Sequence, residues 1–202
     1  MIFSTEEIKK ILVDYEYNRK DIPAGWIYLG DNTVRYVLGQ PVNPKQEPEQ
    51  KNLLIIGVNP STAKPKEPDN TIKRVIGISQ AQGYDGWIMV NIYPQRATNP
   101  KNMTPLSETI LKENIEVIRY IIEKLNIQDV WYAWGDLIDK AKKNMKDILK
   151  NNKKQIDDLL TEKGIQRYHY STLTKKGNPR HPLMVPNDDE FYKINVSTSP
   201  NH

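Results

Sequence analysis

From residue 53 onward the chain alternates short apolar runs with longer segments of helical periodicity, and this alternation constrains the fold more than any other feature. The apolar runs lie at residues 53–58, 87–91, 129–134 and 166–171, and the helix-like segments at residues 71–82, 107–125 and 137–160. Repeated β–α alternation is typical of a parallel sheet with helices on both faces. We therefore expect a three-layer α/β/α fold with a central, mostly parallel sheet of about four strands.

The first 50 residues follow a different pattern. A helix is expected at residues 5–19, and two β-prone runs at residues 26–29 and 33–38 flank Gly30-Asp31-Asn32, which predicts a β-hairpin. Residues 41–51 are rich in Pro, Gln and Glu and predict an exposed connection. We interpret residues 1–202 as a single domain, with residues 1–50 as helix, hairpin and linker and residues 51–186 as the core.

Composition excludes several classes of site. The 202 residues include no cysteine, so disulfides, thiolate-bound metals and thiol nucleophiles are excluded, and the three histidines are far apart in the chain. We expect no metal and no cofactor; a Mg²⁺ ion bound by carboxylates is the one metal site that the composition leaves open. No run approaches the roughly 18 apolar residues of a membrane helix, and the first ten residues lack a signal-peptide core. The expectation is a cytoplasmic monomer with no membrane contact, whose net charge of +4 is compatible with a polyanionic partner.

Polar residues follow the predicted strands where each strand ends. The run Leu53-Leu54-Ile55-Ile56 breaks at Gly57 and is followed by Asn59-Pro60-Ser61-Thr62, Asn91 ends the next run, and His181 follows the last one. Ligands of open α/β sheets bind outside the carboxyl ends of the strands. We therefore expect Asn59, Asn91 and His181 to converge at one edge of the sheet, although Asn, Pro and Ser are also ordinary turn residues.

These residues resemble the uracil-DNA glycosylase superfamily. The resemblance rests on Gly57-Val58-Asn59-Pro60, on Asn91 with Arg96 and Asn99-Pro100 after it, on Ala133-Trp134-Gly135, and on His181-Pro182. A narrower set of motifs is similar to a bacterial and phage domain family of unknown function. Those motifs are Asn59-Pro60-Ser61-Thr62-Ala63, residues 69–74, residues 91–100 and Pro179-Arg180-His181-Pro182-Leu183.

The glycosylase resemblance implies a role for each matching residue. Asn59 would hold the attacking water, Asn91 would bind the Watson–Crick edge of a flipped base, and His181 would donate a hydrogen bond to a base carbonyl as negative charge develops on it. Gly57, Val58 and Pro60 would complete the base pocket. The superfamily's stacking Phe has no counterpart, so Tyr84 or Tyr93 would have to replace it.

Two departures from the superfamily bear on activity. The fastest uracil excision uses an Asp where this chain has Asn59, and an amide cannot act as a carboxylate base. The superfamily's His-Pro-Ser is His181-Pro182-Leu183 here, which removes a hydroxyl that grips a DNA phosphate, although Leu183 or Met184 could wedge into the duplex. The resemblance thus implies weak, altered or absent uracil excision.

A DNA partner would need cations around the site. Asp69 or Asn70 is expected to cap a helix that carries Lys73 and Arg74 near its start; this pattern suits a nearby anion and equally suits an exposed amphipathic helix. The residues expected to contact DNA or its phosphates are Ser61, Thr62, Lys64, Lys73, Arg74, Arg96, Lys101, Lys175, Lys176, Arg180 and Leu183.

Three functions remain open at this point. The first is a glycosylase-like enzyme that binds DNA, single- or double-stranded, and acts on a flipped or modified base. The second is an inactive protein of the same fold that binds DNA or a DNA-mimicking glycosylase-inhibitor protein. The third is an enzyme that acts on free modified nucleotides. Phosphate-binding P-loops and Gly-x-Ser-x-Gly elbows are absent from the sequence.

Overall fold

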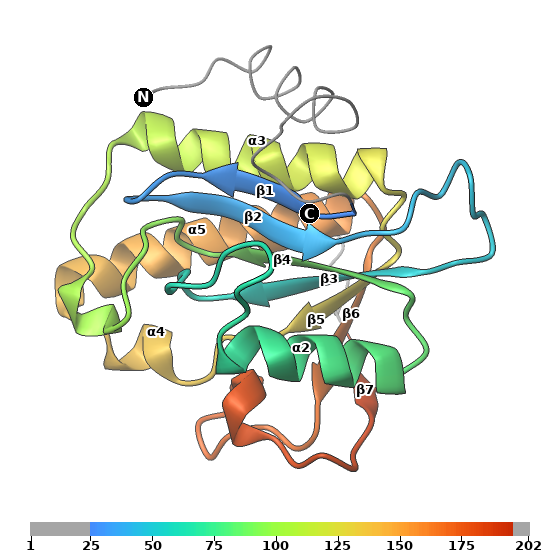
Figure 1. Cartoon of the computed structure of the whole chain (residues 1–202). Helices are drawn as coiled ribbons and strands as arrows, with labels where there is room; N and C mark the ends of the chain where they lie inside the picture. Colours follow the sequence, from blue (N-terminus) through green and yellow to red (C-terminus); the bar gives the residue numbers. More distant parts are fainter. Residues whose placement is uncertain (1–24, 196–202) are drawn as a thin grey trace, which may run out of the picture.

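The structure is a computed structural model that describes residues 25–195. This part of the chain forms one seven-stranded sheet and four α-helices (Figure 1). The strands are β1 (Ile27–Gly30), β2 (Arg35–Gln40), β3 (Asn52–Gly57), β4 (Gly86–Asn91), β5 (Asp129–Tyr132), β6 (Gln166–Tyr170) and β7 (Phe191–Lys193). The helices are α2 (Asn70–Ala81), α3 (Glu108–Lys124), α4 (Leu137–Lys140) and α5 (Lys143–Glu162), with short 3-10 helices η1 (Pro100–Asn102) and η2 (Pro182–Met184). The helix expected at residues 5–19 lies outside the described residues.

The sheet is mixed and larger than the sequence predicted. Its order is β1-β2-β4-β3-β5-β6-β7, and the four inner strands β4, β3, β5 and β6 are parallel. These four correspond to the four apolar runs. The expectation of a mostly parallel sheet of about four strands was wrong at the edges, where β1, β2 and β7 are antiparallel.

The expected hairpin forms and becomes part of the same sheet. β1 pairs with β2, and β2 continues the sheet through pairs such as Leu38 with Met89 of β4. Leu38 is fully buried. The hairpin therefore covers an edge of the parallel core that would otherwise expose unpaired backbone groups.

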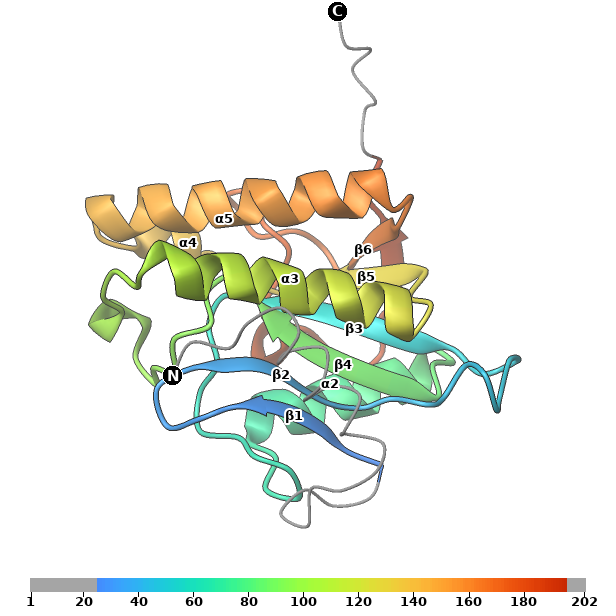
Figure 2. The ribbon, with the colours of Figure 1, turned by 90° about the horizontal axis from the view of Figure 1, so that it is seen from above.

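The chain path creates a crevice at the carboxyl ends of the central strands. From β3 the chain passes through α2 to β4 on one side, and from β4 it returns through α3 to β5 on the other side of β3. Because such crossovers are right-handed, the two connections lie on opposite faces of the sheet. Figures 1 and 2 show α2 on one face, with α3 and α5 on the other. Ligands of open α/β sheets bind at this kind of switch point.

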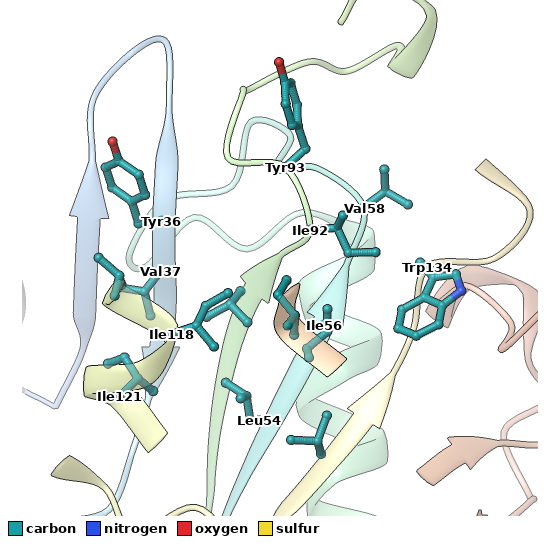
Figure 3. Close-up of a cluster of buried hydrophobic side chains, with 14 of the residues drawn as sticks. Tyr36, Val37, Leu54, Ile56, Val58, Ile92, Tyr93, Ile118, Ile121 and Trp134 are labelled. Carbon is teal, nitrogen blue, oxygen red and sulfur yellow. The ribbon is translucent and has the colours of Figure 1, made fainter. Parts of the chain in front are cut away.

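The residues of β3 explain why its apolar run is unbroken. Leu54 and Ile56 belong to the core cluster beneath α3 and α5, together with Ile118 of α3 (Figure 3). Leu53 and Ile55 point to the other face and belong to the cluster beneath α2. All four β3 side chains are fully buried. Both faces of the strand are covered, so no polar residue alternates along it.

The helix expected at residues 137–160 is interrupted. Ala141 and Lys142 have extended backbone angles and separate α4 from α5. No Pro or Gly marks this break in the sequence. Instead, Asn178 donates hydrogen bonds to Asp139 of α4 and to Asp136 before it, at 2.7 and 2.9 Å. These contacts hold α4 against the loop at residues 172–180, which helical periodicity could not reveal.

Candidate functional site

A cleft of about 750 Å³ opens at the carboxyl ends of the central strands. It is lined by the ends of β3 and β4, the segment after β5, the amino end of α2, and the segments around residues 97–100 and 174–184. This is the crevice that the chain path predicts, and its volume is typical of pockets for small molecules.

The three residues that were expected to converge all line this cleft. They are Asn59 after β3, Asn91 at the end of β4, and His181 at the start of η2. Six other expected site residues also line it: Gly57, Val58, Ser61, Lys175, Arg180 and Leu183. Their convergence was predicted correctly, and their chemical roles stay predictions.

Asn91 presents a buried amide that has no hydrogen-bond partner among residues 25–195. Its side chain is 1% exposed, and neither the amide oxygen nor the amide nitrogen has a hydrogen-bond partner in the described structure. Its backbone carbonyl accepts a hydrogen bond from Asn114, at 2.9 Å, which fixes this end of β4. Gly57 is the cross-strand neighbour, and a Cβ at that position would lie 2.9 Å from the Asn91 Oδ1. The glycine therefore leaves the space in which the Asn91 amide lies.

Asn59 is held by its amide nitrogen. Nδ2 donates to the carbonyl oxygens of Ala97, at 2.7 Å, and Pro60, at 3.1 Å. Two carbonyl acceptors fix the orientation of the amide, because its oxygen would be repelled there. The Oδ1 of Asn59 has no hydrogen-bond partner among the described residues and remains an acceptor for a ligand or a water.

The contacts of His181 define its neutral tautomer. Nδ1 accepts the backbone N–H of Leu183, at 3.3 Å, so the proton of the neutral ring lies on Nε2. Burial lowers the pKa of His181, and the negative charge of Asp69 opposes that shift. Gly135 has a φ of +62°, and a Cβ there would lie 3.3 Å from the His181 Cβ. The ring is thus a neutral Nε2–H donor packed behind a glycine.

Neither tyrosine expected to stack on a base lies in the cleft. Tyr84 precedes β4, at the opposite edge of the sheet, where its hydroxyl donates to Asp129 at 3.0 Å. Tyr93 is fully buried in the core; its hydroxyl donates to the Thr104 carbonyl at 2.6 Å and accepts the Leu106 N–H (Figure 3). Tyr93 is part of the packed core, and Tyr84 is partly buried and packs against it. No Phe, Tyr or Trp among residues 25–195 lines the cleft.

Several residues expected to bind DNA phosphates or the base lie outside the cleft lining; these are Pro60, Thr62, Lys64, Lys73, Arg74, Arg96, Lys101 and Lys176. The two arginines of this set make contacts within the chain. Arg74 donates to the carbonyls of Val185 and Pro186, both at 2.8 Å, and to the Asn187 side chain. Arg96 donates to the Thr62 carbonyl, at 3.0 Å, and to the Tyr28 hydroxyl. These contacts give Arg74 and Arg96 a structural role.

The cleft contains charged residues that sequence reasoning did not assign to the site; of these, Asp69 was expected only as a candidate helix cap, and it does cap α2. Arg35 of β2 lines it and is 3% exposed. Asp69 lines it as well; its Oδ1 caps α2 by accepting the Ile72 N–H at 2.9 Å, and its Oδ2 has no hydrogen-bond partner in the described part. Asp136 accepts from Asn178 and Thr174, and these hydrogen bonds lower its pKa. Lys140 completes the set.

Two other kinds of site are absent from residues 25–195. No group of three or more His, Cys, Asp or Glu in this range could hold a metal ion. No helix in the same range has the length and apolar character needed to cross a membrane.

A family model described as a protein of unknown function, DUF1643, matches residues 35–183. The chain belongs to this family. The matched span begins at Arg35 and ends at Leu183, so it includes all the polar cleft residues described above. No curated protein and no solved structure matches the chain. The likeness to uracil-DNA glycosylases therefore rests on the sequence motifs, and the family description assigns no activity.

Proposed function

We propose that this protein binds a nucleobase in the cleft, presented by DNA as an unpaired or flipped-out nucleotide. The observation that carries the proposal is the Asn91 amide, which is buried, lines the cleft and has no partner for either its donor or its acceptor. A primary amide offers a donor and an acceptor side by side, which matches the edge of a base. Leaving such a group unpaired is costly, so a ligand that satisfies it gains affinity.

Two further groups suit the same ligand. Asn59 has a fixed amide with a free oxygen, which can accept from a base or orient a water. His181 supplies a neutral N–H donor, which can bind a base carbonyl. The three residues together provide donors and acceptors for several edges of one planar heterocycle.

The rim of the cleft suits a DNA strand. Leu183 and Met184 are 46% and 69% exposed and form an apolar lip that could contact unstacked bases. Lys140, Lys175 and Arg180 line the same opening, and they exceed in number the two carboxylates of the cleft. Arg180 also donates to the Thr172 and Leu173 carbonyls, so it offers the strand its charge and its remaining donors. Cations at the rim favour a polyanion through contacts that do not depend on sequence.

A specific observation also favours hydrolysis of the N-glycosidic bond as a second candidate function. Asp69 brings into the cleft a carboxylate that the motif around Asn59 lacks, with one oxygen outside the helix cap. A carboxylate could activate a water that Asn59 orients. Under this proposal uracil excision is weak or altered, because the carboxylate comes from another segment than in the glycosylases that the motifs resemble.

Binding is tested with fluorescent oligonucleotides, single-stranded and mismatched duplex, carrying a panel of normal and modified bases. We expect a preference for at least one base that Asn91→Leu removes, while Asn152→Leu, a change at a buried amide outside the cleft lining, keeps it. A salt series should give a negative slope, and a variant such as Lys175→Gln, which neutralises one cation at the rim, should reduce that slope by about one. A lack of DNA affinity at low salt would refute DNA as the partner.

Hydrolysis is tested by base release from the same oligonucleotides. If the enzyme is active, Asp69→Asn should abolish release and keep the fold, because Asn caps helices about as well as Asp. Asn59→Ala should abolish release and leave DNA affinity nearly unchanged. If the Asp69→Asn variant released the base at the wild-type rate, the Asp69 carboxylate would have no role in hydrolysis.

A further inference from the structure

Arg35 is a buried cation that forms no ion pair with any residue in the range 25–195. Its Nη1 donates to the Ala63 carbonyl at 3.0 Å, its Nε is buried with no hydrogen-bond partner, and no carboxylate of a described residue forms an ion pair with it. Burial lowers the pKa of Arg35 to about 10, and Arg96 nearby adds to this shift. The guanidinium therefore keeps its charge at neutral pH.

An unpaired charge at such a depth is unfavourable unless a partner compensates it. Asp69 attracts Arg35 from within the cleft but lies beyond ion-pair distance. The Ala63 carbonyl accepts one hydrogen bond from Arg35, but as a neutral group it does not balance the charge of the guanidinium. Arg35 lines the cleft, so an anion that enters the cleft could reach it.

Arg167 shows that burial alone does not make an arginine a receptor. It is also buried and its Nε also lacks a hydrogen-bond partner among the described residues, while it donates to the Asp157 carbonyl, at 2.8 Å, and to the Thr161 hydroxyl, at 2.6 Å. It differs from Arg35 in its place, because it lies against α5 and outside the cleft lining. Of the two arginines that are buried within residues 25–195, only Arg35 faces a space that a ligand can occupy.

Besides the carboxylates of Asp69 and Asp136, the cleft contains neutral polar groups and cations. Asn59, Asn91 and His181 offer hydrogen bonds without a formal charge, whereas Arg35 offers a planar fork of N–H donors that suits a phosphate. A cleft of about 750 Å³ has room for a nucleoside with its phosphate.

We propose that Arg35 binds a phosphate group of the ligand, so that the cleft takes nucleotides in preference to free bases or nucleosides. This inference rests on the proposed function, because it adds a phosphate subsite to the base site. The phosphate belongs either to a nucleotide unit of DNA or to a free nucleotide, and both sources offer the same chemistry to Arg35.

The test is calorimetric titration of the full chain with inorganic phosphate, the common nucleosides, their 5′-monophosphates and a short single-stranded oligonucleotide. We expect at least one monophosphate or the oligonucleotide to bind at least about tenfold more tightly than the matching nucleosides. Arg35→Gln should remove that preference, Arg35→Lys should restore part of it, and Arg167→Gln should keep it.

The outcomes separate this inference from the base-binding proposal. Phosphate-dependent binding that Arg35→Gln abolishes, with no effect of base identity or of Asn91→Leu, would support the phosphate subsite and refute base recognition. Nucleosides and monophosphates that bind the wild-type protein equally, with Asn91→Leu defective, would overturn the phosphate subsite and leave base recognition standing. Since this last comparison uses the wild-type protein, it holds even where Arg35→Gln does not fold.

Discussion

Replacement of Asn91 by leucine should make the unliganded protein more stable. A buried polar group without a partner costs about 1–3 kcal/mol, and the Asn91 amide has two such groups. Leucine has nearly the same shape and removes both. We expect the free energy of unfolding to rise by about 2 kcal/mol, which for a chain of this size raises Tm by about 4–8 °C.

The matched control is Asn152→Leu. Asn152 is also buried, but its Nδ2 donates to the Ile92 carbonyl, at 3.3 Å, so its replacement leaves that carbonyl unpaired. This variant should be less stable by about 1–2 kcal/mol. Urea unfolding measures both changes as shifts of the midpoint at constant m-value. A lower midpoint for Asn91→Leu would mean that the folded protein already satisfies the amide, which would refute the argument for a ligand.

Three further predictions concern other positions. Gly57→Ala places a Cβ 2.5 Å from the Met89 Cε and 2.9 Å from the Asn91 Oδ1, so this variant should lower the free energy of unfolding by about 1–3 kcal/mol. Gly77→Ala, in open space on α2, should raise the free energy of unfolding by about 0.5–1 kcal/mol. Equal unfolding midpoints of the two variants in urea would contradict this prediction. Lys142 begins α5 without a side-chain cap, so Lys142→Asp should raise stability by about 1 kcal/mol, and an unchanged midpoint would show that the cap does not form. Because burial lowers the pKa of His181, the unfolded chain binds its proton at higher pH than the folded one; stability should therefore fall as the pH drops below 6.5, and His181→Gln should show a smaller fall, whereas equal pH profiles would refute that assignment.

The parallel core could be predicted from sequence because burial on both faces leaves a strong local signal. Residues 53–58 are apolar without alternation, since helices cover both sides of β3. The edge strands leave a weaker signal. β7 has three residues, of which only Phe191 packs inward against Trp131 and Tyr84. Its pairing with β6 depends on tertiary contacts that a pattern of single residues does not encode.

The amide and imidazole groups of the site could be predicted for a topological reason. Once four runs are assigned to parallel strands, the residues after each run must meet at one edge of the sheet. Asn59, Asn91 and His181 line one cleft for this reason. The glycosylase resemblance placed Tyr84 or Tyr93 in the site, and this was wrong for a different reason in each case. Tyr84 precedes its strand and so lies at the other edge, while Tyr93 follows its strand but turns into the core.

Sequence reasoning expected Lys175 and Arg180 at the site, and both line the cleft. It could not tell which arginines keep donors for a ligand, because their availability depends on contacts between distant segments. Arg74 and Arg96 look like phosphate ligands in the motifs, yet carbonyls from residues 182–186 and from Thr62 take their donors. Arg35 looks like an ordinary hairpin charge, yet in the folded chain its backbone N–H bonds the Pro94 carbonyl, and its side chain is buried at the cleft with one donor unpaired among the described residues. An arginine can bind a ligand only with donors that the chain itself does not use. The number of unused donors is set by the tertiary structure. A cleft arginine whose donors lack partners within the chain is therefore the first residue to test as a ligand-binding group.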